Sequence, residues 1–336
     1  MNPSPVRRES AIRNPRSAIP DVSVCVVNWN CRDHLEGCLR SLRSRLQKVR
    51  LEVIVVDNAS TDGAVEMVAR RFPRVRLIRN EANVGFARAN NRAAAVARGR
   101  YLFFLNNDTV VPSGALRDLL DYAEAHPEAG LIGPRLCDAR GRTQLSCRAR
   151  PTVRALLHRT IPLRWTGLFR RAYRACRGRG QDLETTHAVE VLMGAALLMP
   201  RHVFAECGPW DESYTFGGED IDLCDRVGRH YRVIYHPSVT VTHFGRVSSR
   251  RHIGFAHANT LVGHTRYLRR SGGSRPALWL YKAAVTLDAP LQWLGHAVQF
   301  LWRRLGGRSD RARQSLRALH GVGHFLRHGL WAFWRA

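Results

Sequence analysis

Amide and carboxylate side chains follow three short apolar segments of this 336-residue chain. Short apolar runs bounded by turn-forming residues are typical of buried strands. The carboxyl ends of parallel strands meet at one edge of an open α/β sheet, where ligands bind. The pattern therefore predicts a polar ligand at this edge, although an Asx turn that only caps each strand is the alternative interpretation. The residues concerned are Asn28, Asp57, Asn58, Asn106, Asn107 and Asp108.

Asp108, beside two amides, is suited to a hard cation that bridges phosphate oxygens. A second acidic group follows Gly217 and Gly218, where Glu219 and Asp220 begin a predicted helix. Acidic residues in a first helical turn also interact favourably with the helix dipole, so simple capping is an equally good interpretation for each of them. His243 follows a predicted strand and would matter chemically only if it faced Asp108.

The elements that must position these residues alternate between strand and helix. This alternation predicts an α/β fold that begins as a doubly wound parallel sheet. Asp33 is the predicted N-cap of the first helix, and Thr61 or Asp62 that of the second. The stretch 135–187 has little periodicity and is predicted to be a long connection over the acceptor side. Strands are expected at 21–27, 51–56, 75–78, 101–105, 189–199, 231–235 and 239–242, and helices from 33, 62, 86, 113 (to 130) and 219.

The formal net charge of +26 comes almost entirely from arginine. Such a surface indicates an anionic partner, which could be nucleic acid, acidic lipid or a phosphorylated substrate. No GxGxxG or P-loop sequence occurs, which argues against a dinucleotide-binding or P-loop enzyme. The eight cysteines form no CxxC pair, so reduced, buried thiols of a cytosolic protein are expected rather than zinc ligands. Residues 1–20 are rich in Pro, Ser and Arg and are predicted to be a disordered leader.

Residues 251–336 are predicted to form a helical extension. Pro290 is expected to break the helix that begins near Pro276, and the uncharged run 289–302 is too short to span a bilayer. Residues 312–335 carry apolar side chains on one helical face and basic side chains opposite. This pattern predicts a helix lying on an anionic membrane surface, and packing on the preceding domain is the alternative.

Seven segments in this order resemble family-2 glycosyltransferases of the bacterial rhamnosyltransferase-like branch. The resemblance implies a GT-A fold over residues 21–250, a nucleotide-sugar donor, Mg²⁺ or Mn²⁺, and inversion at the anomeric carbon. The segments are VSVCVVNWN (22–30), EVIVVDNASTD (52–62), NVGFARANN (83–91), YLFFLNNDTVV (101–111), MGAALLMPR (193–201), GPWDESYTFGGEDIDLCDRV (208–227) and VTHFG (241–245).

The resemblance also implies a role for each matching residue. Asp220 matches the general base, with Glu219 beside it, and Asp108 and His243 match cation ligands. The chain departs from the family's DXD element at Asn106, where an amide replaces the first carboxylate. The implied donor-binding residues are Asn28, Asp57, Asn58, Asn83, Gly85, Asn107 and Asp108, and the implied acceptor-binding residues are Trp210, Asp211 and Glu212.

The expected activity is transfer of a sugar from a nucleotide-diphosphate donor, such as dTDP-rhamnose or a UDP-sugar, to a hydroxyl of a glycan or lipid-linked acceptor. The expected setting is cell-envelope polysaccharide synthesis, on the inner face of the cell membrane and without a nucleic-acid partner. Two alternatives stay open. A non-catalytic basic binding protein would explain the charge but not the polar strand ends. A sugar nucleotidyltransferase would share the architecture but normally has a Gly-rich sequence near its first strand.

Overall fold

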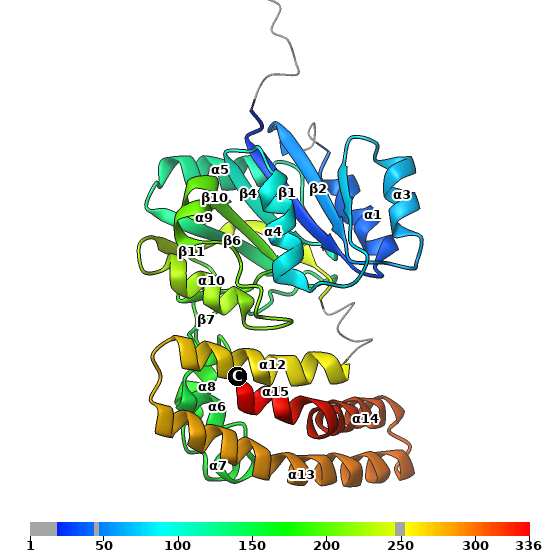
Figure 1. The fold of residues 1–336 in the computed structure, drawn as a ribbon, viewed down its shortest axis with the longest axis vertical. Helices are drawn as coiled ribbons and strands as arrows, with labels where there is room; N and C mark the ends of the chain where they lie inside the picture. Colours follow the sequence, from blue (N-terminus) through cyan, green and yellow to red (C-terminus); the bar gives the residue numbers. More distant parts are fainter. Residues whose placement is uncertain (1–18, 44–46, 246–252) are drawn as a thin grey trace, which may run out of the picture.

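The computed structural model describes residues 19–43, 47–245 and 253–336, so part of the predicted leader and residues 246–252 lie outside the described residues. A sheet domain occupies one end of the molecule, and a layer of helices lies beneath it (Figure 1).

The first half of the sheet follows the predicted alternation. Strands β3, β2, β1 and β4 lie side by side in that order and are parallel, as predicted for a doubly wound half-domain. The apolar sequences of β1, β4 and the second half of β2 are buried between helices on both faces, whereas β3 at the sheet edge is only partly buried. The strands are β1 (Val22–Asn28), β2 (Leu51–Asp57), β3 (Arg76–Arg79) and β4 (Tyr101–Asn106), and the helices are α1 (Arg32–Ser41), α3 (Ala64–Arg71) and α4 (Phe86–Val96).

The second half makes the sheet mixed. Strand β10 (Ala196–Pro200) is antiparallel to β4, and the order continues through β6 (Ala129–Cys137), β11 (Arg232–His243) and β5 (Thr109–Val110). A further strand, β8 (His187–Ala188), pairs with β11.

Strand β6 was not predicted, and the helix expected to reach residue 130 ends earlier, as α5 (Ala115–Ala125). The sequence of β6 contains residues that usually form turns, so it was not recognised as a strand. A Cβ at Gly130 would lie 2.5 Å from the Tyr231 Cβ, and one at Gly133 would lie 2.9 Å from Leu192. These glycines therefore permit close packing inside a strand instead of marking turns.

The predicted helix caps were wrong. Cys31, not Asp33, precedes α1, and Gly63 in the left-handed region (φ 78°) precedes α3. The Asp62 carboxylate accepts hydrogen bonds from the backbone N–H groups of Arg32 and Ala64, so it serves the starts of both helices without being the cap of either.

Two strand boundaries also differ from prediction. The stretch 189–199 is divided into β9 (Val191–Leu192) and β10, because the chain turns at residues 194–195. The two predicted strands at 231–235 and 239–242 are one strand, β11, with an irregularity between residues 236 and 240.

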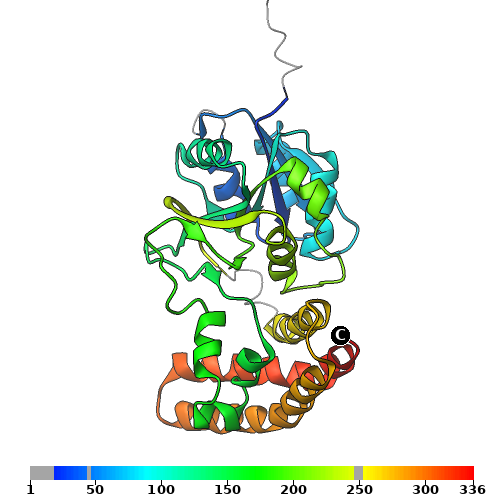
Figure 2. The same cartoon turned by 90° about the vertical axis from the view of Figure 1, so that its left-hand side faces the viewer.

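The predicted connection 135–187 contains regular structure. Strand β7 (Cys147–Arg148) pairs with β9, and three short helices follow: α6 (Val153–Leu157), α7 (Ile161–Thr166) and α8 (Arg170–Cys176). We call residues 151–178 the insert. Figure 2 shows that the insert leaves the sheet domain and joins the helical layer. Leu156 and Leu157 belong to the same buried apolar cluster as the C-terminal helices.

The C-terminal layer consists of α12 (Ile253–Arg270), α13 (Arg275–Leu305), α14 (Ser309–His324), a π-helical turn η1 (Phe325–Gly329) and α15 (Leu330–Arg335). Contrary to prediction, α13 continues through Pro290. A proline removes one backbone donor and does not always end a helix that packing supports. Here the buried Asp288 carboxylate accepts hydrogen bonds from the Ile161 N–H and the Gln292 side chain, which hold this part of α13 against the insert.

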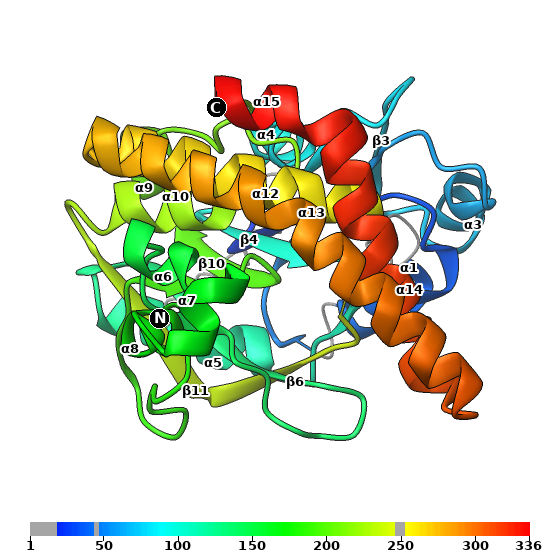
Figure 3. The same cartoon turned by 90° about the horizontal axis from the view of Figure 1, so that it is seen from below.

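The apolar face of residues 312–335 is turned into the protein. Val322, Phe325 and Phe333 are buried against α12 and α13, so the alternative of intramolecular packing is confirmed for this face. Figure 3, a view from below, shows α13 crossing the outer side of the helical layer. Within the described ranges, no helix combines the length and apolar character required to cross a membrane.

Candidate active site

The polar ends of β1, β2 and β4 meet at one edge of the sheet, as predicted. The parallel register places Asn28 level with Asp57, and Val27 level with Asn106. The Asn28 amide donates to Asp57 Oδ1 (2.9 Å) and its oxygen accepts from Asn107 Nδ2 (2.7 Å). All three of these hydrogen-bonding side chains are buried, so they form a rigid, satisfied network instead of isolated strand caps.

A second branch of this network reaches the turn before α4. Asn58 donates to the Gly85 carbonyl (3.3 Å) and accepts from Asn80 Nδ2 (2.6 Å). Asn83 closes the turn by accepting from the Gly85 N–H (3.0 Å). The φ of Gly85 is 87°, and a Cβ there would lie 3.2 Å from the Thr215 carbonyl oxygen. The turn therefore requires glycine, and it brings the strand-end network against the loop that precedes the acidic helix.

Asp108 and His243 face each other. From the sequence alone, His243 was expected to matter chemically only if this was so. Pairing of β5 with β11 sets His243 opposite Thr109, and His243 Nε2 lies 3.4 Å from Asp108 Oδ1. Asn106 Nδ2 also lies 3.4 Å from the same imidazole nitrogen. Both Asp108 and His243 are buried.

Gln144 determines which imidazole nitrogen is free. Its Nε2 donates to the His243 carbonyl (2.7 Å), which leaves its Oε1 to accept at His243 Nδ1 (2.9 Å). Nδ1 must then carry a proton, so Nε2 is the nitrogen that faces Asp108: it presents a lone pair when the ring is neutral and an N–H when the ring is charged. This is the arrangement of a metal-binding histidine that is oriented by an outer partner.

Burial alone would raise the pKa of Asp108, but the hydrogen bond and charge that His243 supplies when its ring is protonated outweigh burial and lower that pKa. The carboxylate is therefore ionised at neutral pH. Within the described residues, no group of three or more His, Cys, Asp or Glu side chains could hold a metal ion. Mg²⁺ is commonly held by one or two protein ligands together with substrate phosphates and water. Asp108 and the Nε2 of His243 fit that minimal set.

The acidic pair opens helix α10 (Glu219–Val227), as predicted. Asp220 Oδ2 lies 3.3 Å from the Arg148 guanidinium, and Oδ1 accepts from the Ile221 N–H (2.9 Å). Glu219 Oε2 is buried and has no partner within the described chain. Burial and the neighbouring Asp220 charge raise the pKa of Glu219. Glu219 is therefore largely protonated near neutral pH, and the Arg148 guanidinium lies beside the other carboxyl group of the pair.

The variant Glu219→Gln should make folding less sensitive to alkaline pH. A carboxyl whose folded-state pKa is raised loses stability as pH rises from its ordinary range through the folded-state pKa. Burial and the Asp220 charge raise the pKa of Glu219 to about 8. Each pKa unit corresponds to about 1.4 kcal/mol, so between pH 5 and pH 9 the variant should avoid a loss on the order of 4 kcal/mol in the free energy of unfolding. Urea unfolding at both pH values measures this difference, with the exposed Glu66→Gln as matched control. An equal alkaline loss in Glu219→Gln and the wild type would show that Glu219 is ionised in the folded protein.

The three predicted acceptor residues lie in a loop beside this pair. Trp210 is 1% exposed and packs edge-on against Phe104 and Phe86. A Cβ at Gly194 would lie 3.4 Å from the Asp220 Cβ and 3.9 Å from the Trp210 ring, so the indole edge borders Asp220 across this glycine.

The other two acceptor candidates are engaged in ion pairs. Glu212 pairs with Arg88 (2.7 Å), and Asp211 pairs with Arg270 of α12. The loop is thereby tied both to helix α4 and to the helical layer. Its role in acceptor binding stays a prediction.

Sequence reasoning missed four side chains of this site. Asn80 follows β3, so the strand-end pattern could have found it. Ser60 lies in the turn after β2, and its Oγ accepts from Asn28 Nδ2 (3.1 Å). Gln144 and Arg148 lie in the stretch 135–187, where no periodicity or motif distinguishes them from the other polar residues.

Comparison with known proteins agrees with this geometry. Residues 23–184 match the family model "Glycosyl transferase family 2". The chain is 31% identical over 289 residues to an N-acetylglucosaminyl-diphospho-decaprenol L-rhamnosyltransferase of Mycobacterium tuberculosis, covering 80% of this chain and 91% of the relative. It is 26% identical to the O-antigen biosynthesis protein RfbC of Myxococcus xanthus, covering 74% of this chain and 19% of that protein.

A solved structure is similar over most of the chain. It is the mannosyltransferase PcManGT from Pyrobaculum calidifontis in complex with GDP-Man and Mn²⁺. The TM-score is 0.52 at 19% identity, with 95% of this chain and 87% of that chain covered. At this identity the likeness concerns the fold, and with the mixed sheet described above it confirms the predicted GT-A architecture.

Proposed function

The chain belongs to glycosyltransferase family 2, and within this family we propose that it transfers a sugar, such as rhamnose, from a nucleotide-diphosphate donor to a lipid-linked acceptor. The acceptor that we propose is a sugar attached through a diphosphate to a polyprenol, as in the name of the Mycobacterium tuberculosis relative. The proposed setting is cell-envelope synthesis at the cytoplasmic face of the membrane.

One observation carries the proposal. The strand-end residues are joined in a single hydrogen-bonded network that includes Asn28, Asp57 and Asn107, and Asp108 with His243 directly adjoins it. A buried, preorganised set of amides and carboxylates at the carboxyl edge of the sheet supports binding of a nucleoside and a diphosphate there. Asp57 and Asn58 are proposed to contact the nucleoside, with Asn28, Asn83 and Gly85 shaping its site and Asn107 contacting the diphosphate.

The reaction requires one base. The acceptor hydroxyl oxygen forms a bond to the anomeric carbon of the donor sugar while the bond from that carbon to the diphosphate oxygen breaks. We propose that Asp220 takes the hydroxyl proton, and that attack from the face opposite the diphosphate inverts the anomeric configuration. Glu219 remains protonated beside it and limits the local charge, and Trp210, Asp211 and Glu212 border the acceptor. Mg²⁺ or Mn²⁺, held by Asp108 and His243, would supply a Lewis acid for the diphosphate.

Donor assays test this function directly. Incubation with a panel of nucleotide sugars and a polyprenyl-diphosphate-linked sugar, with and without Mg²⁺ or Mn²⁺, should release a nucleoside diphosphate and extend the acceptor. Release of pyrophosphate instead would indicate nucleotidyl transfer. Failure to bind any donor would favour a non-catalytic basic protein.

An exposed apolar stripe on α13 supports the membrane part of the proposal. The stripe follows the spacing of one helical face, and several of its side chains are more than half exposed. Helix α7 contacts α13 at the lower end of the molecule (Figure 1), and its Trp165 is 87% exposed. The stripe residues are Leu280, Leu287, Leu291, Leu294, Val298, Leu301 and Leu305.

The charge around this stripe favours lipid over a second protein copy. Arginines flank both ends of α13, and the chain carries a net charge of +26, which repels a like-charged copy but attracts an anionic bilayer. The surface proposed for membrane contact is therefore α13, not the buried apolar face of residues 312–335.

The double variant Leu287→Glu/Leu294→Glu should bind vesicles of anionic phospholipid at least tenfold more weakly than the wild type, because two charges would enter the interface. Vesicle flotation measures this, and Ile19→Glu/Leu145→Glu, two exposed positions on the sheet domain, is the matched control. Equal vesicle binding by all three proteins, or a wild-type dimer that the stripe variant abolishes, would refute the lipid assignment.

A further inference from the structure

A basic hollow lies between the insert, α10 and α12. Its volume is about 220 Å³, and it is bordered by Ile221, the residue after the proposed base. Three arginines from separate elements converge on it: Arg148 from β7, Arg159 from the loop after α6, and Arg177 from the end of α8. None of these three arginines belongs to the proposed donor site.

The charge of this hollow is not balanced by the protein. Arg148 pairs with Asp220 at 3.3 Å, whereas Arg159 and Arg177 form no ion pair with the described residues. His264 of α12 also lines the hollow, and its buried Nδ1 has no partner in the described structure. Burial, followed by the charges of the three arginines, lowers the pKa of His264 to about 3, so it is neutral. A hollow lined, within the described residues, by two unpaired guanidinium groups and a neutral, unpartnered imidazole is suited to bind an anion.

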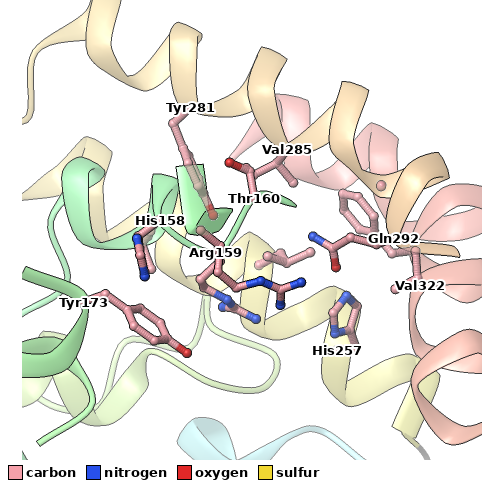
Figure 4. A pocket seen from close by; sticks show the side chains of 14 residues that line it. His158, Arg159, Thr160, Tyr173, His257, Tyr281, Val285, Gln292 and Val322 are labelled. Carbon is pink, nitrogen blue, oxygen red and sulfur yellow. The ribbon is translucent and has the colours of Figure 1, made fainter. Parts of the chain in front are cut away.

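A second hollow of about 240 Å³ continues from the first. The two share Leu156, Arg159 and Tyr173, and the second extends to Val285 and Ala289 of α13. Figure 4 shows Arg159 at the centre of this second hollow, with Tyr173 on one side and His257 on the other. Leu261, Val322 and Phe325 add apolar lining. A basic chamber therefore opens into a partly apolar one that ends under the helix bearing the exposed stripe.

We propose that Arg148, Arg159 and Arg177 bind the diphosphate of the lipid-linked acceptor, an assignment that rests on the function proposed above. Guanidinium groups match phosphate oxygens with paired donors, and three of them suit the charge of a diphosphate. Because Arg148 also contacts Asp220, a sugar joined to this diphosphate would lie with its hydroxyls within reach of the base. The polyprenyl chain would follow the second hollow towards α13.

The donor diphosphate has a different site. Asn107, which is proposed to contact it, and the proposed cation ligands Asp108 and His243 lie at the ends of β4 and β11, where Gln144 orients His243. The arginine cluster comes from β7 and the insert, neither of which belongs to the strand-end network. Loss of the cluster should therefore affect one substrate and leave the other unchanged.

Binding measurements with full-length Arg159→Gln/Arg177→Gln test the assignment. Farnesyl diphosphate should bind this variant at least tenfold more weakly than the wild type, while affinity for nucleoside diphosphate should not change. The matched control is Arg170→Gln/Arg171→Gln, which removes two exposed charges of the insert that do not line either hollow. This control should bind farnesyl diphosphate as the wild type does. Equal weakening in both variants, or unchanged affinity in Arg159→Gln/Arg177→Gln, would overturn the proposal.

Three further probes separate the possible sources of the diphosphate. Farnesol should compete poorly, because it lacks the anion, and inorganic pyrophosphate should compete less well than farnesyl diphosphate, because it leaves the second hollow empty. Anionic vesicles should bind both double variants equally. Pyrophosphate competing as well as farnesyl diphosphate, or vesicle binding lost only in Arg159→Gln/Arg177→Gln, would refute an acceptor site.

Transfer assays keep this inference distinct from the proposed function. The cluster variant should raise KM for a diphosphate-linked acceptor at least tenfold and leave KM unchanged for an alkyl glycoside of the same sugar. A wild-type protein that transfers no sugar but shows the predicted difference in farnesyl diphosphate binding would refute the proposed function alone. Transfer by the wild type with no difference between the variants would refute the cluster alone.

Discussion

Replacement of Asp220 by Asn should reduce kcat for sugar transfer by about two to four orders of magnitude, which is the usual contribution of a general base. The amide is isosteric with the carboxylate, and its one oxygen can still accept from the Ile221 N–H, although the contact with Arg148, which uses the other oxygen of Asp220, is lost. The fold and the donor site should therefore persist while proton acceptance is lost. Steady-state kinetics with the preferred donor, together with donor affinity and the unfolding midpoint, measure these effects.

A charge control separates the chemical role of Asp220 from a general electrostatic effect. Asp310→Asn removes a carboxylate that is 89% exposed on α14, and its kcat should equal that of the wild type. The Asp220→Asn variant should also lose the acidic limb of the pH profile for kcat, because the group that must be ionised is absent. Near-normal turnover in Asp220→Asn would transfer the base role to another group, and Glu219, with its unpartnered Oε2, would be the next to replace.

The strand ends could be predicted from sequence because two simple rules apply to them. Apolar runs such as 22–27 are stable only when they are buried in the interior, and parallel strands end at a common edge of the sheet. The register that sets Asn28 beside Asp57 follows from those rules. These rules do not predict which side chains form hydrogen bonds. The Asp57 carboxylate accepts hydrogen bonds from the Asn28 side chain and the Ser60 N–H, so part of its role is to hold the sheet edge rigid.

The elements that escaped prediction lack a readable period. Strand β6 contains Gly130, Gly133 and Pro134, which normally indicate turns but here permit close packing. Helices α6, α7 and α8 have five to seven residues each, fewer than two turns in any case, so no amphipathic repeat can develop. Arg148 and Gln144 are consequently placed by tertiary packing alone, although they contact Asp220 and His243.

The amphipathic pattern of residues 312–335 illustrates a different limit. An apolar helical face predicts burial, but it does not distinguish a bilayer from neighbouring helices. Phe325 and Phe333 are buried in the protein. In α13, by contrast, Leu287 and Leu294 remain exposed, because only the opposite face of that long helix contacts α12 and α14. Whether residues 312–335 or α13 leave an apolar face exposed therefore depends on how the whole helical layer packs.

Asp108→Asn is the second substitution with a large expected effect. Asp108 would provide the only carboxylate of the proposed cation site, since an amide already occupies position 106. Its loss should reduce cation-dependent transfer by about two to three orders of magnitude, because stabilisation of charge by a bound divalent ion contributes several kcal/mol. Donor affinity should lose its dependence on Mg²⁺ or Mn²⁺, whereas affinity for the nucleoside alone should not change.

The same replacement distinguishes a cation role for Asp108 from a purely structural one. A carboxylate that served only to pair with His243 would lower stability when neutralised, and that loss would be the same with and without metal. A cation ligand instead makes thermal stabilisation by added Mn²⁺ plus nucleoside diphosphate disappear in the variant, because binding to the folded state is what raises the midpoint. The exposed Asp118→Asn is the matched control and should retain the full stabilisation. Metal-dependent stabilisation and transfer that persist in Asp108→Asn would place the cation elsewhere, and His243→Ala would then be expected to leave metal dependence intact as well, because its Nε2 is directed at Asp108.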